Sequence, residues 1–533
     1  MRPRISSGVA REGAEKETQR ERKERERKPK PKKTKPKTAL KTRQGPDLLL
    51  DCPESLSNSI LKDWLSMEDI GRLDSAYCCS RRSSFLALLA CSTRVLTCSW
   101  FGIVLGAEVV TSSRGSSSKS VARVLEWLAL REVRLNTLKL PSYSNTVRSS
   151  LYSKVFRLTG QHLTELWLYD VDHVERTLDL AARHCPNLQL LDLTYASLQG
   201  ANLYQVLQKC PLETLILENS TGLNLVFFRY WAGPELPLKV LNLAGLGSDV
   251  DNELLSYIGR WCPHLIELEL SECGYSDEGL ISIALGCPSM QRLFLTESAT
   301  EPLPLTDRSI CQVAAHCPSL TVLDVSYCYS LTPASFDALG RLGLKSLSAN
   351  LVLTDESLLA LVAHKPPLQV LHMGECDIND DALETLAIAC PGLEEIEIAD
   401  DQDLTDAGLI ALAEHCKKLR YLALEDLPLV TDSGLHAIAT ACPDLVEVSV
   451  RRCHGVTQGG VTHLVTGATH LKLLMLTEIT PWARELCDSV RPGLSLCSAL
   501  AAEYPTDADF EEVLWSKYYS SCGAHWQSFS LIR

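Results

Sequence analysis

An LxxLxL pattern recurs along most of this chain, and it limits the possible folds more than any other feature of the sequence. Successive copies start 24–27 residues apart, except for one step of 30 residues. The thirteen copies start at Leu163, Leu188, Leu212, Leu238, Leu265, Met290, Leu320, Leu344, Leu368, Leu393, Leu419, Leu445 and Leu471. A degenerate earlier copy starts at Leu135. A period of this length indicates an array of stacked units instead of separate globular domains.

Each unit joins two kinds of segment. In the LxxLxL part, apolar and polar residues alternate as in a half-buried strand, whereas residues 405–415 place apolar residues at helical spacing. Thr-Asp pairs at 354–355, 405–406 and 431–432 offer a hydroxyl for a helix N-cap and a carboxylate in the first turn. Cys-Pro ends most of the helical parts, because proline does not continue a helix. The sequence therefore predicts an α/β solenoid.

Cysteines follow the same register. Twelve of the 21 cysteines occupy two fixed positions of the unit. Those before the strand are Cys185, Cys210, Cys262, Cys287, Cys317, Cys390, Cys416 and Cys442, and those after it are Cys273, Cys328, Cys376 and Cys453. A zinc site needs clustered spacing such as CxxC pairs, and free cysteine packs well as a small apolar side chain. Structural burial is the favoured interpretation over metal binding, and no cofactor is predicted.

These features together resemble the cysteine-containing leucine-rich repeat, whose pattern is CPxLxxLxLxxC followed by Thr-Asp and an amphipathic helix. The stretch from Cys262 to Cys273, CPHLIELELSEC, follows this pattern closely. The resemblance covers residues 135–480, about two thirds of the chain. It implies a horseshoe of about 13 to 14 repeats, with parallel strands on the concave face and helices on the convex face.

Side chains between the leucines are expected on the concave face, because side chains alternate along a strand. This face is acidic with scattered aromatic residues. The candidate substrate-binding residues are Trp167, Tyr169, Glu267, Glu269, Phe294, Asp324, His372, Glu395, Glu397, Tyr421 and Glu447. Aromatic anchors suit protein interfaces, and carboxylates suit a basic partner segment. A solvated acidic face without a partner is the alternative, because carboxylates about 10 Å apart repel only weakly in water.

An enzyme is disfavoured. Paired carboxylates permit acid–base chemistry, but a repeat array provides an open trough instead of a closed, water-excluding pocket. The sequence also places no histidine, nucleophile elbow or phosphate loop in a recognisable catalytic context. We therefore predict a non-catalytic binding protein.

Residues 47–98 precede the repeats and have helical periodicity. The candidate adaptor-binding residues are Pro53, Leu56, Ile60, Leu61, Trp64, Leu65, Ile70 and Leu73. Their order resembles an F-box, although Cys52 stands before the proline and Arg81-Arg82 occupy the region of the family's tryptophan. The resemblance implies docking to a Skp1-like adaptor and its cullin complex. A plain helical cap for the first repeat is the alternative.

The ends of the chain differ from the repeats in composition. Residues 1–43 carry 17 Lys or Arg and six Glu, so the remainder carries a net charge of −25 within the total of −14. The basic tail is predicted to be disordered. It suggests a nuclear-localisation signal, a plain solvated charge run or a segment that folds back on the acidic body, whereas sequence-specific nucleic-acid binding is disfavoured because no recognition motif accompanies the charge.

No apolar stretch is long enough to span a membrane.

The predicted divisions are a basic tail at 1–46, an F-box-like segment at 47–98, a linker and N-terminal cap at 99–134, the solenoid at 135–480, and a C-terminal cap or tail at 481–533. The predicted function is a substrate-recognition subunit of an SCF-type (Skp1–cullin–F-box) E3 ubiquitin ligase in the cytoplasm, the nucleus or both. It would bind a protein substrate on the concave face for proteasomal degradation. The alternative is a leucine-rich-repeat scaffold or inhibitor of a regulatory protein, for example in cell-cycle control.

Overall fold

The chain divides into two compact units, residues 1–53 and 54–533. All the residues that the computed structural model describes belong to the second unit, and they are 136–140, 149–169, 174–198, 203–222, 228–296 and 305–498.

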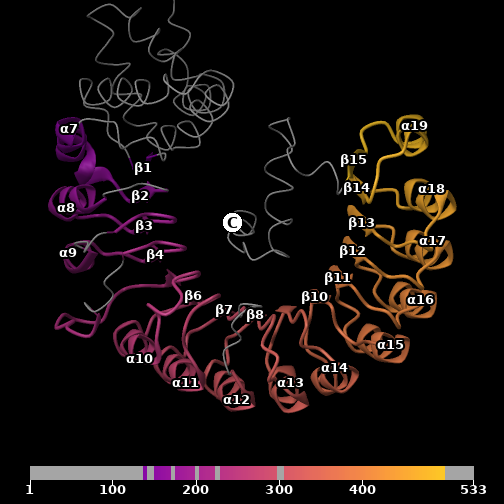
Figure 1. Cartoon of the computed structure of the whole chain (residues 1–533), viewed down its shortest axis with the longest axis horizontal. Helices are drawn as coiled ribbons and strands as arrows, with labels where there is room; N and C mark the ends of the chain where they lie inside the picture. Colours follow the sequence, from indigo (N-terminus) through magenta and orange to yellow (C-terminus); the bar gives the residue numbers. More distant parts are fainter. Residues whose placement is uncertain are drawn as a thin grey trace, which may run out of the picture. The chain divides into compact units, whose positions relative to one another are not determined.

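In this part of the chain, fifteen strands form one parallel sheet whose order follows the sequence from β1 to β15. The strands are β1 (Thr137–Leu140), β2 (Glu165–Leu168), β3 (Leu190–Asp192), β4 (Thr214–Ile216), β5 (Val240–Asn242), β6 (Glu267–Glu269), β7 (Arg292–Phe294), β8 (Val322–Asp324), β9 (Ser346–Ser348), β10 (Val370–Gly374), β11 (Glu395–Ala399), β12 (Tyr421–Glu425), β13 (Glu447–Arg451), β14 (Leu473–Leu476) and β15 (Ser495–Ser498). Within the second unit the strands line the inner side of an arc (Figure 1).

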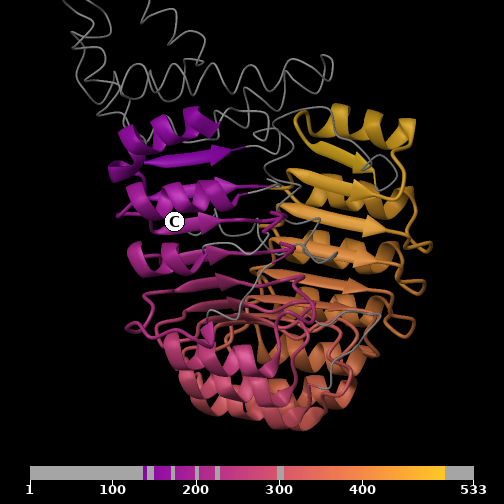
Figure 2. The same cartoon turned by 60° about the vertical axis from the view of Figure 1, so that its left-hand side comes forward.

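Helices connect the strands and lie on the outer side of the arc (Figures 1 and 2). They are α7 (Ser149–Thr159), η2 (Gly160–His162), α8 (Glu175–His184), α9 (Leu203–Lys209), α10 (Asn252–Trp261), α11 (Asp277–Gly286), α12 (Asp307–His316), α13 (Pro333–Gly340), α14 (Asp355–Val362), α15 (Asp380–Ala389), α16 (Asp406–His415), α17 (Asp432–Ala441), α18 (Gln458–Gly467) and α19 (Pro481–Val490). The predicted α/β solenoid is confirmed, with parallel strands on one face and helices on the other.

The sheet extends beyond the solenoid limits of 135–480 that the pattern predicts. Helix α19 and strand β15 add one further unit, and β15 pairs in parallel with β14. Leu494 and Leu496 are partly buried against the core. Their spacing continues the strand alternation, although the full LxxLxL pattern is lost there.

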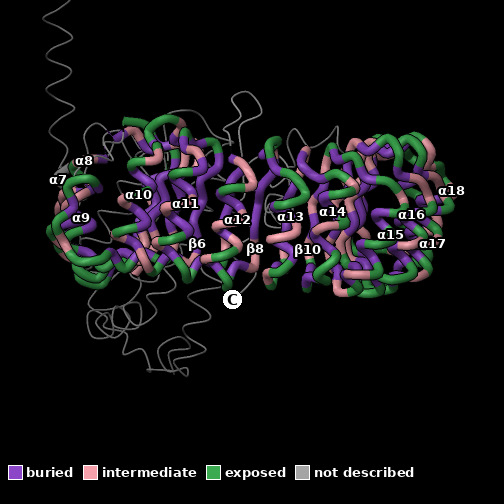
Figure 3. Tube along the Cα trace, turned by 90° about the horizontal axis from the view of Figure 1, so that it is seen from below, coloured by how far each residue is buried: buried purple, intermediate pink, exposed green. Residues whose placement is uncertain are grey.

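Buried leucines hold each unit to its neighbours. Leu265, Leu268 and Leu270 of one unit have no exposed surface, and buried stretches run through every unit, with exposed stretches on the helices and the turns (Figure 3). Because an LxxLxL unit directs its leucines to one side, stacking the units produces one continuous apolar core.

The repeat cysteines belong to this core, as the sequence predicts. All twelve are buried. The thiol of Cys287 lies 3.4 Å from the carbonyl of Cys262 in the preceding unit, and that of Cys442 lies 3.6 Å from the carbonyl of Cys416. Burial raises the pKa of Cys287 to about 12. A thiol with such a pKa stays protonated at neutral pH, so these cysteines act as small buried side chains with weak hydrogen bonds.

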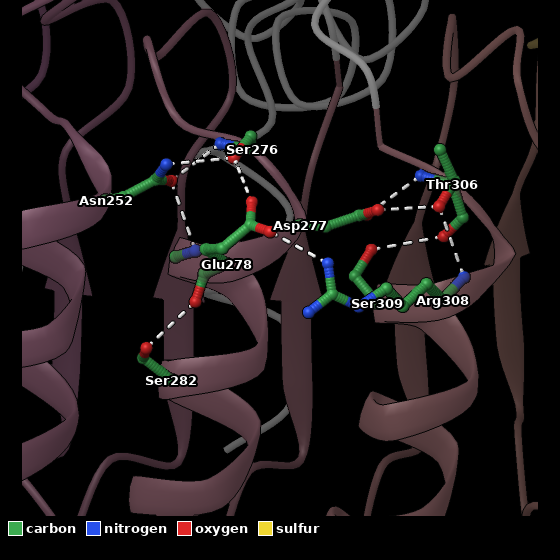
Figure 4. A network of polar contacts seen from close by, with 9 residues as sticks. Asn252, Ser276, Asp277, Glu278, Ser282, Thr306, Arg308 and Ser309 are labelled. Carbon is green, nitrogen blue, oxygen red and sulfur yellow. Dashed lines mark hydrogen bonds and ion pairs between the residues drawn. The ribbon is translucent and has the colours of Figure 1, made fainter.

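A second series of contacts joins the starts of the helices. Thr306 is the N-cap of α12. Its amide and its hydroxyl also donate hydrogen bonds, at 2.9 and 2.6 Å, to the two carboxylate oxygens of Asp277 in the preceding helix, α11 (Figure 4). The same arrangement recurs between Asp380 and Thr405. The predicted threonine caps are therefore confirmed, and the aspartate does more than balance the helix dipole. It ties its own helix to the next one. We call this series the Asp–Thr ladder.

The ladder has one interruption between α10 and α18. Helix α13 starts with Pro333 where its neighbours have an aspartate or asparagine. In the next unit, the hydroxyl of Thr354 instead lies 3.2 Å from a carboxylate oxygen of Glu356 in its own helix. The contacts resume at Asp355, whose Oδ1 accepts the amide of Asn379 at 3.0 Å.

Candidate functional site

Strands β10 to β13 are five residues long, whereas β5 to β9 have three residues each. The added length gives three rows of side chains that run across the inner face. In register from β10 to β13 these rows are Val370, Glu395, Tyr421 and Glu447, then His372, Glu397, Ala423 and Ser449, then Gly374, Ala399, Glu425 and Arg451. The structure thus brings five predicted residues, His372, Glu395, Glu397, Tyr421 and Glu447, onto one surface. We call it the acidic face.

His372 and Glu395 form a pair at one side of the acidic face. The Nε2 atom of His372 lies 3.2 Å from Glu395 Oε1, and its Nδ1 atom lies 3.2 Å from the hydroxyl of Ser348. Desolvation acts to lower the pKa of His372, but the hydrogen bond to Glu395 and the charges of Glu397, Glu395 and Asp324 outweigh it, so the pKa lies above its ordinary value. At neutral pH the imidazole therefore carries more positive charge than an ordinary histidine.

The opposite rim of the acidic face is balanced by arginines. Arg451 lies 3.1 Å from one oxygen of Glu425, and Arg452 lies 3.0 Å from the other. Arg452 also reaches Asp426 at 3.1 Å. Burial raises the pKa of Glu425 although both arginines act to lower it. The carboxylates of Glu395, Glu397 and Glu447 lie in the first two rows, away from this rim, and His372 partly offsets the charge of Glu395.

Tyr421 lies between Glu395 and Glu447 in the first row. All three side chains are half-buried. The guanidinium of Arg420 lies 5.6 Å from the centre of the Tyr421 ring. Burial and the nearby charge of Glu447 raise the pKa of Tyr421, so the phenol remains a neutral hydrogen-bonding group. An aromatic ring between two carboxylates suits the amphipathic side chain of lysine or arginine.

Four of the predicted substrate-binding residues are not exposed, which corrects the expectation from the sequence. Glu267, Glu269, Phe294 and Asp324 are each less than a tenth exposed, at 1%, 2%, 7% and 1%. In this structure they offer almost no surface to a partner.

Local contacts explain the burial of these carboxylates. Glu267 stands opposite Arg292 in the sheet register, and the Nε atom of Arg292 donates to it at 2.8 Å. Burial raises the pKa of Glu267 although Arg292 acts to lower it. Glu269 and Asp324 instead fold back and accept the amide of the residue two positions later, at 2.9 and 2.8 Å. Both carboxylates thus cap the ends of their own strands.

Trp167 and Tyr169 lie at the other end of the described sheet. Trp167 is half-buried on β2, and Tyr169, directly after β2, is 52% exposed. The ring of Tyr169 meets that of Tyr195 edge to face, with centroids 5.6 Å apart. The sheet separates this aromatic pair from the acidic face by several strands, so the predicted residues form two surfaces instead of one.

Some residues at these surfaces are not covered by the alternation of side chains along a strand. Tyr195, Asp400, Asp426 and Arg452 all follow a strand and have φ between 51° and 58°, a left-handed conformation that favours glycine. Strand alternation does not predict where such a side chain points. The sequence nevertheless contains a signal for this conformation, because all four residues occupy the same position of the repeat unit.

Several predictions lie outside the described residues. These are the adaptor-binding candidates Pro53, Leu56, Ile60, Leu61, Trp64, Leu65, Ile70 and Leu73, the basic tail at 1–46, and the last part of the chain from residue 499. They remain predictions.

In the described ranges, no helix is both long and apolar enough to cross a membrane. The same ranges contain no group of three or more His, Cys, Asp or Glu residues placed to hold a metal ion.

The strands, helices and buried leucines define an open leucine-rich-repeat solenoid. In agreement, the family model described as "Leucine Rich repeat" matches residues 262–284 and 364–387. Among curated proteins, the DNA repair protein rhp7 of Schizosaccharomyces pombe is 28% identical over 189 residues, which cover 34% of this chain and 32% of that protein. The chain thus matches about a third of the length of this relative.

Solved structures give more distant likenesses. The crystal structure of the yeast Rad7 and Elc1 complex matches with 17% identity and a TM-score of 0.45, over 83% of this chain and 100% of the matched chain. The crystal structure of a TLR13–ssRNA13 complex has the same identity and TM-score, over 64% of this chain and 50% of the matched chain.

Proposed function

We propose that this chain is a non-catalytic substrate-recognition subunit of an SCF-type E3 ubiquitin ligase. The acidic face binds a basic segment of a protein substrate. Residues 47–98 dock a Skp1-like adaptor and, through it, the cullin complex. The chain then positions the substrate for ubiquitin transfer and proteasomal degradation without making or breaking a bond itself.

The observation that carries the proposal is the arrangement of the acidic face. Glu395, Tyr421 and Glu447 stand side by side on neighbouring strands, and Glu397 occupies the next row. The arginines of this surface are paired with Glu425 and Asp426 at its rim. Unlike charges about 4 Å apart near a protein surface attract by about 4 kcal/mol before desolvation is subtracted. Such a surface favours fast association with a basic segment.

The ligase part of the proposal is supported by the sequence ahead of the repeats. The F-box-like order of residues 47–98 stands directly before a leucine-rich-repeat solenoid. The partial likeness to a DNA repair protein supports a nuclear location, because repair takes place on DNA, and the basic residues 1–43 offer a nuclear-localisation signal.

The adaptor is tested by pull-down of the full chain with a Skp1-like protein, with Elc1 as a second bait. We expect the Skp1-like protein to be retained, and the double change Ile60→Ala and Leu61→Ala to abolish retention without changing the thermal melt of the solenoid. Retention that is indifferent to this double change would leave the scaffold alternative as the better account.

The acidic face is tested separately by charge reversal. Glu395→Lys with Glu397→Lys should weaken capture of a substrate identified by proximity labelling, and should also reduce the salt dependence of binding. The matched control reverses Asp381 and Glu384, which are exposed on helix α15. Equal effects of the two double variants would show a general charge effect and contradict a role for this face.

A further inference from the structure

His372 lies among carboxylates on the inner side of the described sheet. Leu371 and Met373 on either side of it are buried in the core, so His372 points to the acidic face because side chains alternate along a strand. Its Nε2 atom lies 3.2 Å from Glu395 Oε1, and Glu397 stands opposite it in the sheet register. The side chains of His372 and Glu395 are 16% and 24% exposed, so both are sheltered from water but within reach of a partner.

The groups that face the imidazole from other strands are polar or negative. On β9, the hydroxyl of Ser348 lies 3.2 Å from its Nδ1 atom. On β11, Glu395 and Glu397 act on the imidazole through their charges, and Asp324 of β8 adds a third negative charge. Helices α14 and α15 cover the opposite side of the sheet (Figure 1), so their charged residues do not face the ring.

Basic side chains of the described strands lie farther from His372. Strands β8 to β12 contain no Lys or Arg. The next along the sheet are Arg292 of β7 and Arg451 of β13, each three strands from β10. They are paired with Glu267 and Glu425. Histidine is the side chain whose ordinary pKa lies between pH 5 and 8. A proton on His372 therefore adds or removes positive charge on this part of the acidic face.

We propose that His372 is a pH-sensitive switch, which weakens the binding of a basic partner segment when its imidazole is protonated. The protonated ring places a positive charge beside Glu395 and Glu397, the carboxylates to which a lysine or arginine of the partner binds, and it repels that side chain. Binding is restored when the proton leaves. The pKa of His372 lies above its ordinary value, so more than half of the rings are protonated at pH 6.5. This inference rests on the proposed binding function and adds its regulation by pH.

Proton and partner oppose each other at the same carboxylates, which gives the switch a second signature. A bound partner must lower the proton affinity of His372 by the same factor as the proton lowers the affinity for the partner. Binding near the midpoint of the pH transition should therefore release protons. Like charges less than a Debye length apart are only partly screened at physiological salt. We expect an affinity change of about three- to tenfold, which should shrink as salt is added.

The test uses the full chain and a labelled Gly-Ser peptide with blocked ends and three spaced lysines, which has no group that titrates between pH 6 and 8.5. Fluorescence anisotropy at constant ionic strength should show about three- to tenfold tighter binding at pH 8.5 than at pH 6. His372→Gln should bind equally at both pH values, and His372→Lys should bind weakly at both. His454→Gln, a change at an exposed histidine, should keep the pH dependence of the unchanged chain.

The results distinguish the switch from the proposed function. Isothermal titration calorimetry in two buffers of different ionisation enthalpy should detect proton release with the unchanged chain and none with His372→Gln. Binding that is independent of pH, or a pH dependence that persists in His372→Gln, overturns the switch while the binding function stands. A peptide that fails to bind at any pH refutes the acidic face as a site for basic segments, and the switch with it.

Discussion

Individual side chains on the strand face differ in exposure although the sequence pattern treats them alike. Glu395 and Glu269 occupy strand positions that both face inward, yet Glu395 remains partly exposed beside His372 whereas Glu269 is buried against the amide of Ser271. A carboxylate near the end of a three-residue strand can reach back to the backbone. Whether a carboxylate is exposed or bonded to the backbone depends on the length of its strand and on the turn that follows the strand. The spacing of the leucines does not encode either feature.

His372 makes the stability of the folded chain depend on pH. Its pKa is raised in the folded chain, so its contribution to stability is fully present below the unfolded pKa of about 6.5 and is lost as the pH rises through the folded value. His372→Gln should therefore lower Tm more at pH 6 than at pH 8, as measured by thermal melts. His454→Gln, a change at an exposed histidine, should shift Tm equally at both. A pH-independent effect of His372→Gln would contradict the assignment.

Among the elements, the helix starts contribute more than the repeat pattern indicates. The Thr-Asp pair predicts a cap and a first-turn charge, but not that the aspartate binds the threonine of the next helix. Partial burial acts to raise the pKa of Asp307, yet hydrogen bonds from Ser335 and Thr332 outweigh it and hold the pKa below its usual value. This carboxylate therefore stabilises the folded state above its unfolded pKa, and the contribution is lost only as the pH falls toward the lower folded pKa.

Removing one aspartate of the Asp–Thr ladder tests this conclusion. Asp406 accepts the amide and hydroxyl of Thr431 at 2.8 and 2.5 Å, and the amide of Gly434 at 3.1 Å. Asp406→Ala should cost about 1.5–3 kcal/mol of unfolding free energy, the range for hydrogen bonds to a charged group. Asp381→Ala removes an exposed first-turn charge of α15 and should cost about 0.3–1 kcal/mol. If urea unfolding showed similar losses of unfolding free energy for both variants, the first-turn charge would matter and the hydrogen bonds between helices would not.

For the whole molecule, the repeat register determined most of what the sequence could predict. The LxxLxL copies from Leu163 to Leu471 correspond to strands β2 to β14. The leucines of each copy must face the core, and this requirement fixes which side chains of the strand point to the other side. The two candidate surfaces, the acidic face and the aromatic pair of Tyr169 and Tyr195, were harder to locate. Tyr195 follows its strand in a left-handed conformation, and the grouping of His372 with Glu397 depends on how neighbouring units align.

The stacked core predicts large costs for small internal changes. Leu268 has no exposed surface, so Leu268→Ala should lower the unfolding free energy by about 2–5 kcal/mol. Leu285 is 58% exposed on α11, and Leu285→Ala should change it by less than about 0.5 kcal/mol. Urea unfolding followed by circular dichroism distinguishes the two. Equal midpoints for both variants would show that the described unit is not stacked as observed.

The missing tie at Pro333 has a mechanical consequence. Where an aspartate clamps each helix to the next, adjoining units resist being pried apart or sheared. Between α10 and α18, only the joint of α13 with α14 has no such clamp, so we expect this joint to yield first under load although the two helices pack closely. A bound polypeptide that pulls on strands on either side of β9 would then change the curvature of the solenoid mainly at the joint between α13 and α14.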